Sequence, residues 1–274
     1  RLTYMGEHKD WDGILKEVSK QDALSNEYKH KYVLLALSET DRLPDYAFRY
    51  GLSSSNDFHF QNPDDPLALK FNILFYRALG LQNAVVYYAY QQSLQSLPGL
   101  SYDAMRTLAD AYLQLKDYRL AKKYMDILEH SSCNDRWVDQ RKMKLYSIME
   151  TAPDYHMTGE KFVLEDFYRD MSALVTRYPA ERKYADYLLC GLLADKNGNM
   201  FLNVFDRVAG THYDDTRTMP VLYQEAICLI GSYEPEVLAK YPVDERIMQR
   251  FKDFMGLLNN GKASQAKRKY ADTY

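Results

Sequence analysis

The segment from Ser101 to His130 constrains the fold most, because its apolar and small residues recur at helical spacing in two successive stretches. Side chains three and four positions apart share one face of an α-helix. The residues on these faces are Met105, Leu108, Ala109 and Tyr112 before a break, and Tyr118, Ala121, Tyr124, Met125 and Leu128 after it. The break is Lys116-Asp117, so the segment predicts two amphipathic helices that form an antiparallel hairpin.

The same arrangement recurs twice upstream at nearly constant intervals. The equivalent positions are Val33, Phe71 and Leu108, then Leu37, Phe75 and Tyr112, and then Leu43, Leu81 and Tyr118 at the expected turns, with intervals of 38 and 37 in each set. The small residue after the turn is in step at Ala84 and Ala121 but one position late at Ala47. Three copies in register are the number that a stacked helical array needs to bury a continuous core.

The order of residues in the clearest copy resembles the tetratricopeptide (TPR) repeat, whose unit is a helix pair of about 34 residues. The matching residues are Leu108-Ala109, Tyr112, Asp117-Tyr118, Ala121 and Tyr124. The resemblance implies an all-α fold, a TPR-like superhelix of antiparallel helical hairpins. Where a TPR would place its small alanine after the turn at Lys196-Asn197-Gly198, this chain has Phe201, so the later hairpins are expected to pack differently.

The repeat pattern fades after His130, which suggests a division of the chain into two regions. Residues 1–150 are expected to form the TPR-like array, closed by a long helix that begins at Asn134 or Asp135. Residues 151–274 are expected to form divergent helical hairpins packed on that array, as part of one continuous solenoid. The stretch from Thr151 to Gly159 contains proline and glycine and is predicted to be a loop or linker.

Composition excludes several functional classes. The net charge of −3 offers no broad positive field, so nucleic acid is not an expected partner. The three cysteines, Cys133, Cys190 and Cys228, lack the spacing of a zinc site or a disulfide framework. Apolar runs such as Tyr187 to Ala194 are far shorter than the roughly 20 residues that cross a bilayer. No membrane segment, metal or cofactor is therefore expected in this chain.

No sequence motif for catalysis is present either. The chain has no HExxH, P-loop, GxGxxG or GxSxG sequence, and its histidines are scattered. The densest polar cluster, His212 to Asp215, lies between Gly210 and Pro220 and is interpreted as a solvated loop. The basic residues Lys262, Lys267, Arg268 and Lys269 are interpreted as the solvated face of a last helix. We expect no catalytic residues.

The TPR resemblance implies a concave surface lined by the first helix of each unit. The residues carried over from the resemblance are Asp103, Arg106, Asp110, Leu113 and Gln114 in the clearest copy, Leu69, Ile73, Tyr76 and Arg77 in the middle copy, and Lys31, Leu35 and Glu39 in the first. The predicted partner-binding groove consists of Arg106, Asp110, Gln114, Tyr76, Arg77 and Ile73. Arginine and tyrosine are among the residue types that contribute most at protein interfaces.

Three phrases are similar to an uncharacterised family of Bacteroidetes integral membrane proteins, in which a multispanning region precedes a helical-repeat portion. They are Arg42-Leu43-Pro44-Asp45 through Phe48-Arg49-Tyr50, Tyr118 through Ala121 to Tyr124 with the later Trp137, and Tyr184 to Lys196. This resemblance implies an extramembrane portion of a bacterial inner-membrane protein, and it would explain a sequence that begins at Arg1. It implies no activity.

The sequence therefore predicts a non-enzymatic helical-repeat scaffold that binds a protein or peptide and belongs to a larger membrane-associated protein. The alternative is an all-α enzyme or small-molecule binder that uses the junction between the two helical halves, near Thr151 to Gly159 and His212 to Asp215. A deep pocket with convergent carboxylate and histidine groups would favour this alternative.

Overall fold

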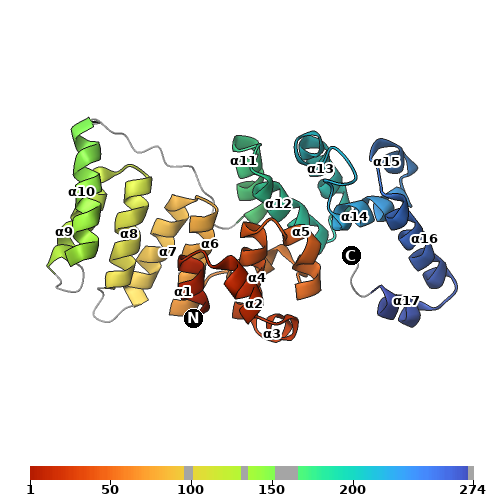
Figure 1. The fold of residues 1–274 in the computed structure, drawn as a ribbon, viewed down its shortest axis with the longest axis horizontal. Coiled ribbons are helices and arrows are strands. Elements are labelled where there is room, and N and C mark those ends of the chain that lie inside the picture. Colours follow the sequence, from red (N-terminus) through yellow and green to blue (C-terminus); the bar gives the residue numbers. More distant parts are fainter. Residues whose placement is uncertain (96–100, 131–134, 152–165, 271–274) are drawn as a thin grey trace. The chain divides into compact units, whose positions relative to one another are not determined.

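The computed structural model describes residues 1–95, 101–130, 135–151 and 166–270, and these residues form helices joined by turns, without a strand (Figure 1). The helices are α1 (Leu2–Glu7), α2 (Trp11–Glu17), α3 (Lys20–Ser25), α4 (Glu27–Glu39), α5 (Leu43–Tyr46), α6 (Pro66–Ala78), α7 (Gln82–Gln95), α8 (Tyr102–Gln114), α9 (Tyr118–Glu129), α10 (Asp135–Thr151), α11 (Phe167–Arg177), α12 (Arg182–Ala194), α13 (Gly198–His212), α14 (Val221–Gly231), α15 (Pro235–Lys240), α16 (Glu245–Asn259) and α17 (Ala263–Lys269), with the 3₁₀ helices η1 (Ala47–Tyr50) and η2 (Ser55–Phe58). The predicted all-α class is confirmed.

Six helix-to-helix turns in the described residues share one backbone geometry. Each contains a residue with positive φ two positions after the end of the preceding helix, and these residues are Lys9, Asp41, Gly80, Lys116, Lys196 and Gly261. The next amide N–H donates to the carbonyl five residues earlier, as in Asp117 to Tyr112 at 2.9 Å and Asn197 to Leu192 at 2.8 Å. This is the Schellman motif, which ends a helix by satisfying its free carbonyl groups.

The second helix of a hairpin usually begins directly after this turn, often with a side-chain cap. The Asp117 carboxylate accepts from the Leu120 amide at 3.0 Å, and the Asn197 carboxamide oxygen accepts from the Met200 amide at 3.2 Å. Such caps satisfy amide groups that have no partner inside the helix. The sequence thus encodes a compact helix–turn–helix unit that recurs along the chain.

Contacts divide the chain into two compact units. Unit 1 comprises Arg1, Thr3 and His59–Glu165, and unit 2 comprises Leu2, Tyr4–Phe58 and Asp166–Tyr274. The sequence had suggested a boundary near residue 150. The contacts place residues 4–58 with residues 166–274, because α12 contacts α4, α5 and η2, and α14 contacts α5.

Unit 1 is built from helices that are consecutive in the sequence. α6 packs on α7, α7 on α8, α8 on α9, and α9 on α10, as Figure 1 shows in orange to green. The repeated apolar positions form its core, since Phe71 and Leu108 are at most 2% exposed. A buried side chain fixes the entry to α6: Asn72 accepts from the Phe60 amide at 2.9 Å and donates to the Phe60 carbonyl at 2.8 Å.

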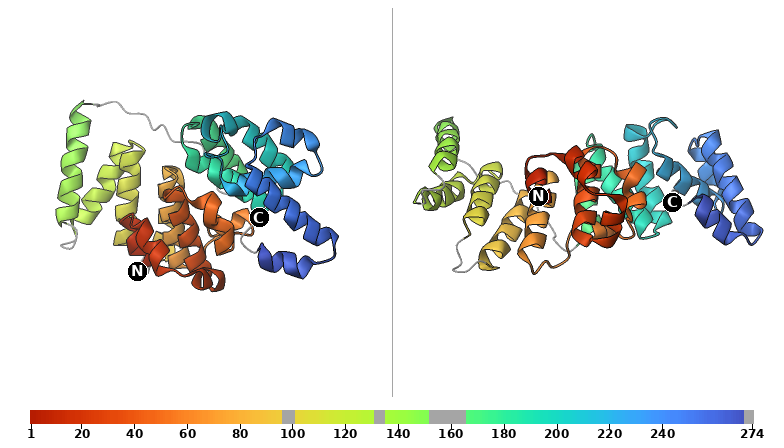
Figure 2. Two further views of the ribbon diagram at one scale, coloured as in Figure 1. Left: turned by 45° about the vertical axis from the view of Figure 1, so that its right-hand side comes forward. Right: turned by 60° about the horizontal axis from the view of Figure 1, so that its bottom comes forward.

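Unit 2 is built from an N-terminal and a C-terminal segment of the chain. In Figure 2 its N-terminal helices, coloured red to orange, lie beside the teal α12, in agreement with the contacts of α4 and α5. The Lys31 side chain of α4 is buried and donates to the carbonyl of Asn56 at 3.0 Å, which ties α4 to η2. Burial lowers the pKa of Lys31 despite the nearby carboxylates of Glu27 and Asp57.

Several local expectations need correction. The partner of α4 is a single helical turn, α5, followed by η1, rather than a full second helix. α13 continues through Gly210 to His212, so the polar cluster starts at a helix end, and Tyr213 within it is buried. The short helices α1, α3 and α15 carry no periodic apolar pattern long enough to predict them.

Candidate functional site

In unit 1 the helices α6, α8 and α10 are linked by charged side chains. Lys70 Nζ of α6 lies 2.8 Å from the Asp103 carboxylate of α8. The Arg141 guanidinium of α10 binds Asp110 of α8 through two contacts of 2.5 and 3.1 Å. Burial opposes the charge of Asp103, but hydrogen bonds from Lys70 and Gln92 outweigh it and hold the pKa of Asp103 below its usual value.

The aromatic ring of Trp137 lies beside the charged side chains that link α8 and α10. The Arg141 guanidinium lies 3.8 Å from the centroid of the Trp137 ring, and the Arg106 guanidinium lies 5.7 Å from it. These distances are within the range of cation–π interactions. Arg106 and Asp110, both predicted to contact a partner, are therefore half-buried groups that already help to pack α10 on α8.

The other four predicted groove residues divide into two pairs. Arg77 and Gln114 are exposed, and neither makes an ion pair or side-chain hydrogen bond with another described residue. Ile73 and Tyr76 are only 6% and 3% exposed, so they belong to the core rather than to an open surface. Tyr76 stacks on Tyr88 with ring centroids 5.3 Å apart.

A shift of one residue in the register of α6 accounts for the burial of Ile73 and Tyr76. The turn residues Gly80 and Lys116 are 36 positions apart, whereas the sequence comparison used an interval of 37. An interval of 36 pairs Tyr76 with the buried Tyr112 and pairs Lys70 with Arg106. Lys70 is thus the residue of α6 that is equivalent to Arg106 of α8. This equivalence follows when the two hairpins are aligned on their turn residues, Gly80 and Lys116.

The most unusual titratable group of unit 2 is Asp186 on α12. Its Oδ1 accepts hydrogen bonds from the hydroxyls of Tyr213 and Tyr223, at 2.6 and 2.7 Å, and its Oδ2 accepts from Arg182 Nε at 3.1 Å. The thiol of Cys190 lies 3.6 Å from the Tyr223 hydroxyl. This cluster joins α12 to α14 and to the residue that follows α13.

Burial raises the pKa of Asp186 to about 6, although Arg182 and the two tyrosine hydroxyls favour its charged form. A raised carboxyl pKa is typical of a general acid. However, the side chains of Asp186, Tyr213 and Tyr223 are at most 2% exposed, so a substrate has no access to them in this conformation. The geometry supports a structural role, in which one carboxylate satisfies three donors.

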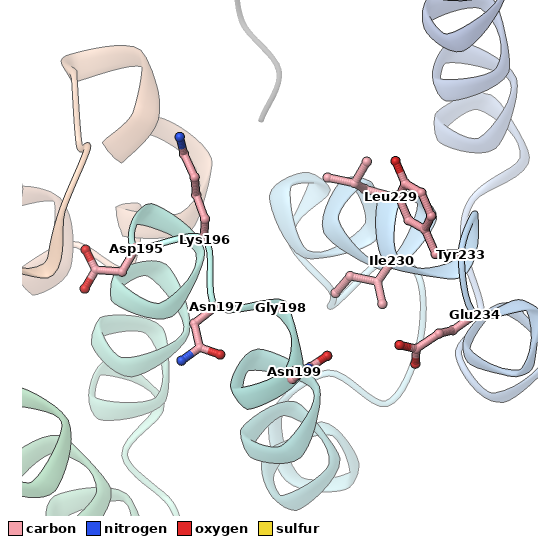
Figure 3. A pocket seen from close by; sticks show the side chains of 9 residues that line it. All are labelled: Asp195, Lys196, Asn197, Gly198, Asn199, Leu229, Ile230, Tyr233 and Glu234. Atoms are coloured by element: carbon pink, nitrogen blue, oxygen red, sulfur yellow. The ribbon is translucent and has the colours of Figure 1, made fainter.

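A hollow of about 510 Å³ opens at the turn between α12 and α13, opposite the end of α14 (Figure 3). Its lining residues are Asp195, Lys196, Asn197, Gly198, Asn199, Leu229, Ile230, Tyr233 and Glu234. Figure 3 shows the turn residues on one side and Leu229, Ile230, Tyr233 and Glu234 on the other.

An apolar slot of about 610 Å³ adjoins this hollow, because Lys196, Gly198, Leu229 and Ile230 line both. Its remaining walls are formed mainly by Phe48, Leu52, Leu193, Ala194 and Ala226. Both spaces lie within unit 2. The sequence did not predict this site, since its walls come from η1, α12 and α14, which are far apart in the chain.

The charged groups around the hollow differ in their engagement. The Asp195 carboxylate accepts from the Ser55 amide at 3.1 Å, from the Ser55 hydroxyl at 2.6 Å and from the Tyr168 hydroxyl. Burial opposes its charge, but these bonds outweigh burial and lower the pKa of Asp195. Lys196 and Glu234, by contrast, form no ion pair with any described residue.

Comparison with known families now places the chain. The model of the family of unknown function DUF6057 matches residues 1–274. The chain belongs to this family. No curated protein and no solved structure matches it.

Some of the remaining sequence predictions for the DUF6057 chain concern residues that the structure describes, and others do not. Cys190 and Cys228 are buried, and Cys133 lies outside the described residues. In the polar cluster after α13, the Asp215 carboxylate binds the Arg217 guanidinium at 3.0 Å and organises a local turn. The other half of the predicted junction site, residues 152–159, also lies outside the described residues.

Two further observations on the DUF6057 chain concern membrane-spanning helices and metal-binding clusters. None of the helices in the described ranges is both long and apolar enough to cross a membrane. Within the same ranges, no group of three or more histidine, cysteine, aspartate or glutamate side chains is arranged to hold a metal ion.

Proposed function

We propose that this chain is a non-enzymatic, TPR-like helical-repeat module that binds a segment of another protein. We further propose that it belongs to a larger membrane-associated protein, as its resemblance to a Bacteroidetes membrane-protein family implies. The single observation that carries the proposal is the helix–turn–helix unit whose turn recurs six times in the described residues. Stacked units of this kind present extended surfaces for partners.

The part of unit 1 that is open to a partner includes the ends of α6 and α8. Arg77 and Gln114 lie near those ends with exposed side chains. Arg106 and Asp110 lie earlier in α8, where the contacts to α10 hold them in place. Side chains that packing already holds lose little conformational entropy when a partner binds, which favours recognition.

The test is affinity capture of partners by the full-length parent protein from its native cells, with the double variant Arg77→Glu, Gln114→Glu as comparison. Both positions are exposed, so the variant is expected to fold normally. Reversal and addition of charge at the proposed surface should reduce the specifically captured partners at least tenfold, as measured by quantitative mass spectrometry.

A matched control changes the charge by the same amount on the second helices of the hairpins. Arg119 is exposed on α9 and Gln91 is half-buried on α7, so Arg119→Glu, Gln91→Glu serves this purpose. The control should retain the partners. Retention of all partners by the Arg77→Glu, Gln114→Glu variant would show that the groove assignment is wrong, and equal loss in both variants would indicate a non-specific charge effect.

A further inference from the structure

The hollow and slot of unit 2 form a second binding position with its own chemistry. We propose that they bind an extended segment of a partner protein in which a large apolar side chain adjoins an aspartate or glutamate. This inference rests on the proposed function, because it assumes a protein partner, and it adds the recognition chemistry of a site outside the predicted groove.

The slot supplies the apolar half of this recognition. Leu193 and Ala226 form its buried base, whereas Leu229 and Ile230 are half-buried and leave apolar surface accessible. A volume of about 610 Å³ lies within the usual range of small-ligand pockets, so the slot has room for a large apolar side chain. Burial of one leucine or phenylalanine side chain there removes apolar surface of both molecules from water.

Lys196 supplies the charged half. It lines both spaces, its side chain is exposed, and it has no carboxylate partner among the described residues. The neighbouring Asp195 carboxylate instead accepts hydrogen bonds from Ser55 and Tyr168. The Schellman turn fixes the Lys196 backbone at φ 59°, so the ammonium group is attached to a rigid base beside the slot.

The adjoining hollow suits a peptide main chain better than the tail of a lipid-like acid. Its walls include the polar side chains of Asn197 and Asn199, and the Glu234 carboxylate opposes a second negative charge. Tyr233, at 80% exposed, provides an aromatic surface at the rim. An alkyl tail longer than the slot would contact these polar groups, whereas peptide amides can form hydrogen bonds with them.

The experiment uses fluorescently labelled peptides in a Gly/Ser background with the central pair Leu-Glu, Leu-Gln, Leu-Lys or Ala-Glu, titrated with the whole chain by fluorescence anisotropy. The Leu-Glu peptide should bind best. We expect about fivefold weaker binding for Leu-Gln and on the order of tenfold weaker binding for Ala-Glu. Unlabelled dodecanoate serves as a competitor that carries a carboxylate and an alkyl tail without peptide groups.

The variant Lys196→Glu should reverse the preference, so that Leu-Lys binds better than Leu-Glu. Lys116→Glu is a matched control, because Lys116 occupies the same turn position in unit 1 with φ 60°. This control should leave the order of the peptides unchanged. Arg77→Glu, Gln114→Glu should also leave it unchanged, which separates failure at this site from failure of the proposed function.

Three results would overturn the inference. One is an order of peptides that Lys196→Glu does not alter, and another is binding of none of the peptides at millimolar concentration. The third is tight, Lys196-dependent binding of dodecanoate by a chain that binds the peptides weakly, which would identify the site as one for an amphiphilic acid.

Discussion

Unit 1 and unit 2 are both made of helical hairpins, but the residues that contact each other within each unit are separated by very different distances in the sequence. In unit 1 each helix from α6 to α10 packs on its neighbour in the chain. In unit 2 the bonds between Ser55 and Asp195 span 140 residues, and the ion pair of Lys183 with Glu39 spans 144. Unit 1 is therefore assembled from pairs of helices that are neighbours in the sequence, whereas unit 2 requires two segments that are distant in the sequence to pack together.

The polar contacts follow the same division. The ion pairs that link α6, α8 and α10 lie at the surface, and the buried Asn72 binds Phe60, only 12 residues away. Unit 2 instead buries an aspartate among two tyrosines and an arginine, and a lysine against backbone carbonyls. The difference suggests that buried polar groups specify the pairing of segments that no short turn connects.

The largest effect is expected from Asp186→Ala. The change leaves two buried tyrosine hydroxyls and the Arg182 guanidinium without their acceptor, which should destabilise unit 2 by about 3–5 kcal/mol. In unit 1, Asp110→Ala removes a half-exposed ion pair and should cost about 1 kcal/mol or less. Denaturant titration followed by hydrogen-exchange mass spectrometry measures both variants.

Hydrogen exchange also shows where the effect is located. Asp186→Ala should accelerate exchange in α12 and α14 and leave α6 to α9 at the rate of the unaltered chain. Equal acceleration of exchange throughout the chain in both variants would contradict the proposed contrast, in which unit 1 is assembled by local helix pairing and unit 2 is specified by buried polar groups.

A smaller effect of about 3 kcal/mol is expected from the titration of Asp186. The pKa of Asp186 is about 6 in the folded chain against 3.8 for an unperturbed aspartate side chain, so the folded state binds the proton more tightly. Stability from this group is fully present below pH 4 and is lost as the pH rises to about 6. The stability of the unaltered chain minus that of Asp186→Asn should fall over this window, as measured by urea unfolding between pH 4 and 7.

The difference between the two proteins isolates Asp186, because carboxylates with a lowered pKa, such as Asp103 and Asp195, act in the opposite direction in both. A pH-independent difference would mean that Asp186 ionises in the folded chain as it does in the unfolded chain.

Local packing explains which parts of the fold the sequence could predict. The apolar positions of Val33, Phe71 and Leu108 recur at nearly constant intervals, and all three side chains are buried. Helical periodicity and turn residues therefore sufficed for the all-α class and for most helices longer than ten residues. Arg77 and Gln114 are exposed, in agreement with the surface positions that the TPR resemblance implied for them.

The remaining features depend on information that periodicity does not carry. The turns after α6 and α8 are 36 residues apart, whereas the apolar positions match at 37. Because of this difference of one residue, Ile73 and Tyr76 lie in the core and not on the predicted surface. Asp186 stands in an otherwise apolar run, Tyr184 to Ala194, and only its distant partners reveal its role. The hollow beside Lys196 likewise depends on pairing between η1, α12 and α14.

The smallest effects test whether the hairpin turn is the same in both units. Lys116 and Lys196 have φ of 60° and 59°, a conformation that disfavours residues with a Cβ atom, whereas the equivalent residue of the α6–α7 hairpin is Gly80 at 76°. Lys116→Gly and Lys196→Gly should each stabilise the chain by about 0.5–1 kcal/mol. Gly80→Ala should destabilise it by about 1 kcal/mol through backbone strain alone, since no atom beyond the adjacent residues lies within 4 Å of the added Cβ.

Thermal and urea unfolding of the three variants measure these effects, with Lys123→Gly on the exposed face of α9 as the control in which glycine should destabilise a helix by about 1 kcal/mol. Because the turn is satisfied by bonds within its own hairpin, the gain should be equal in the two units even though their cores are assembled differently. A gain at Lys116 without a gain at Lys196 would show that long-range packing in unit 2 extends its control to the local turn.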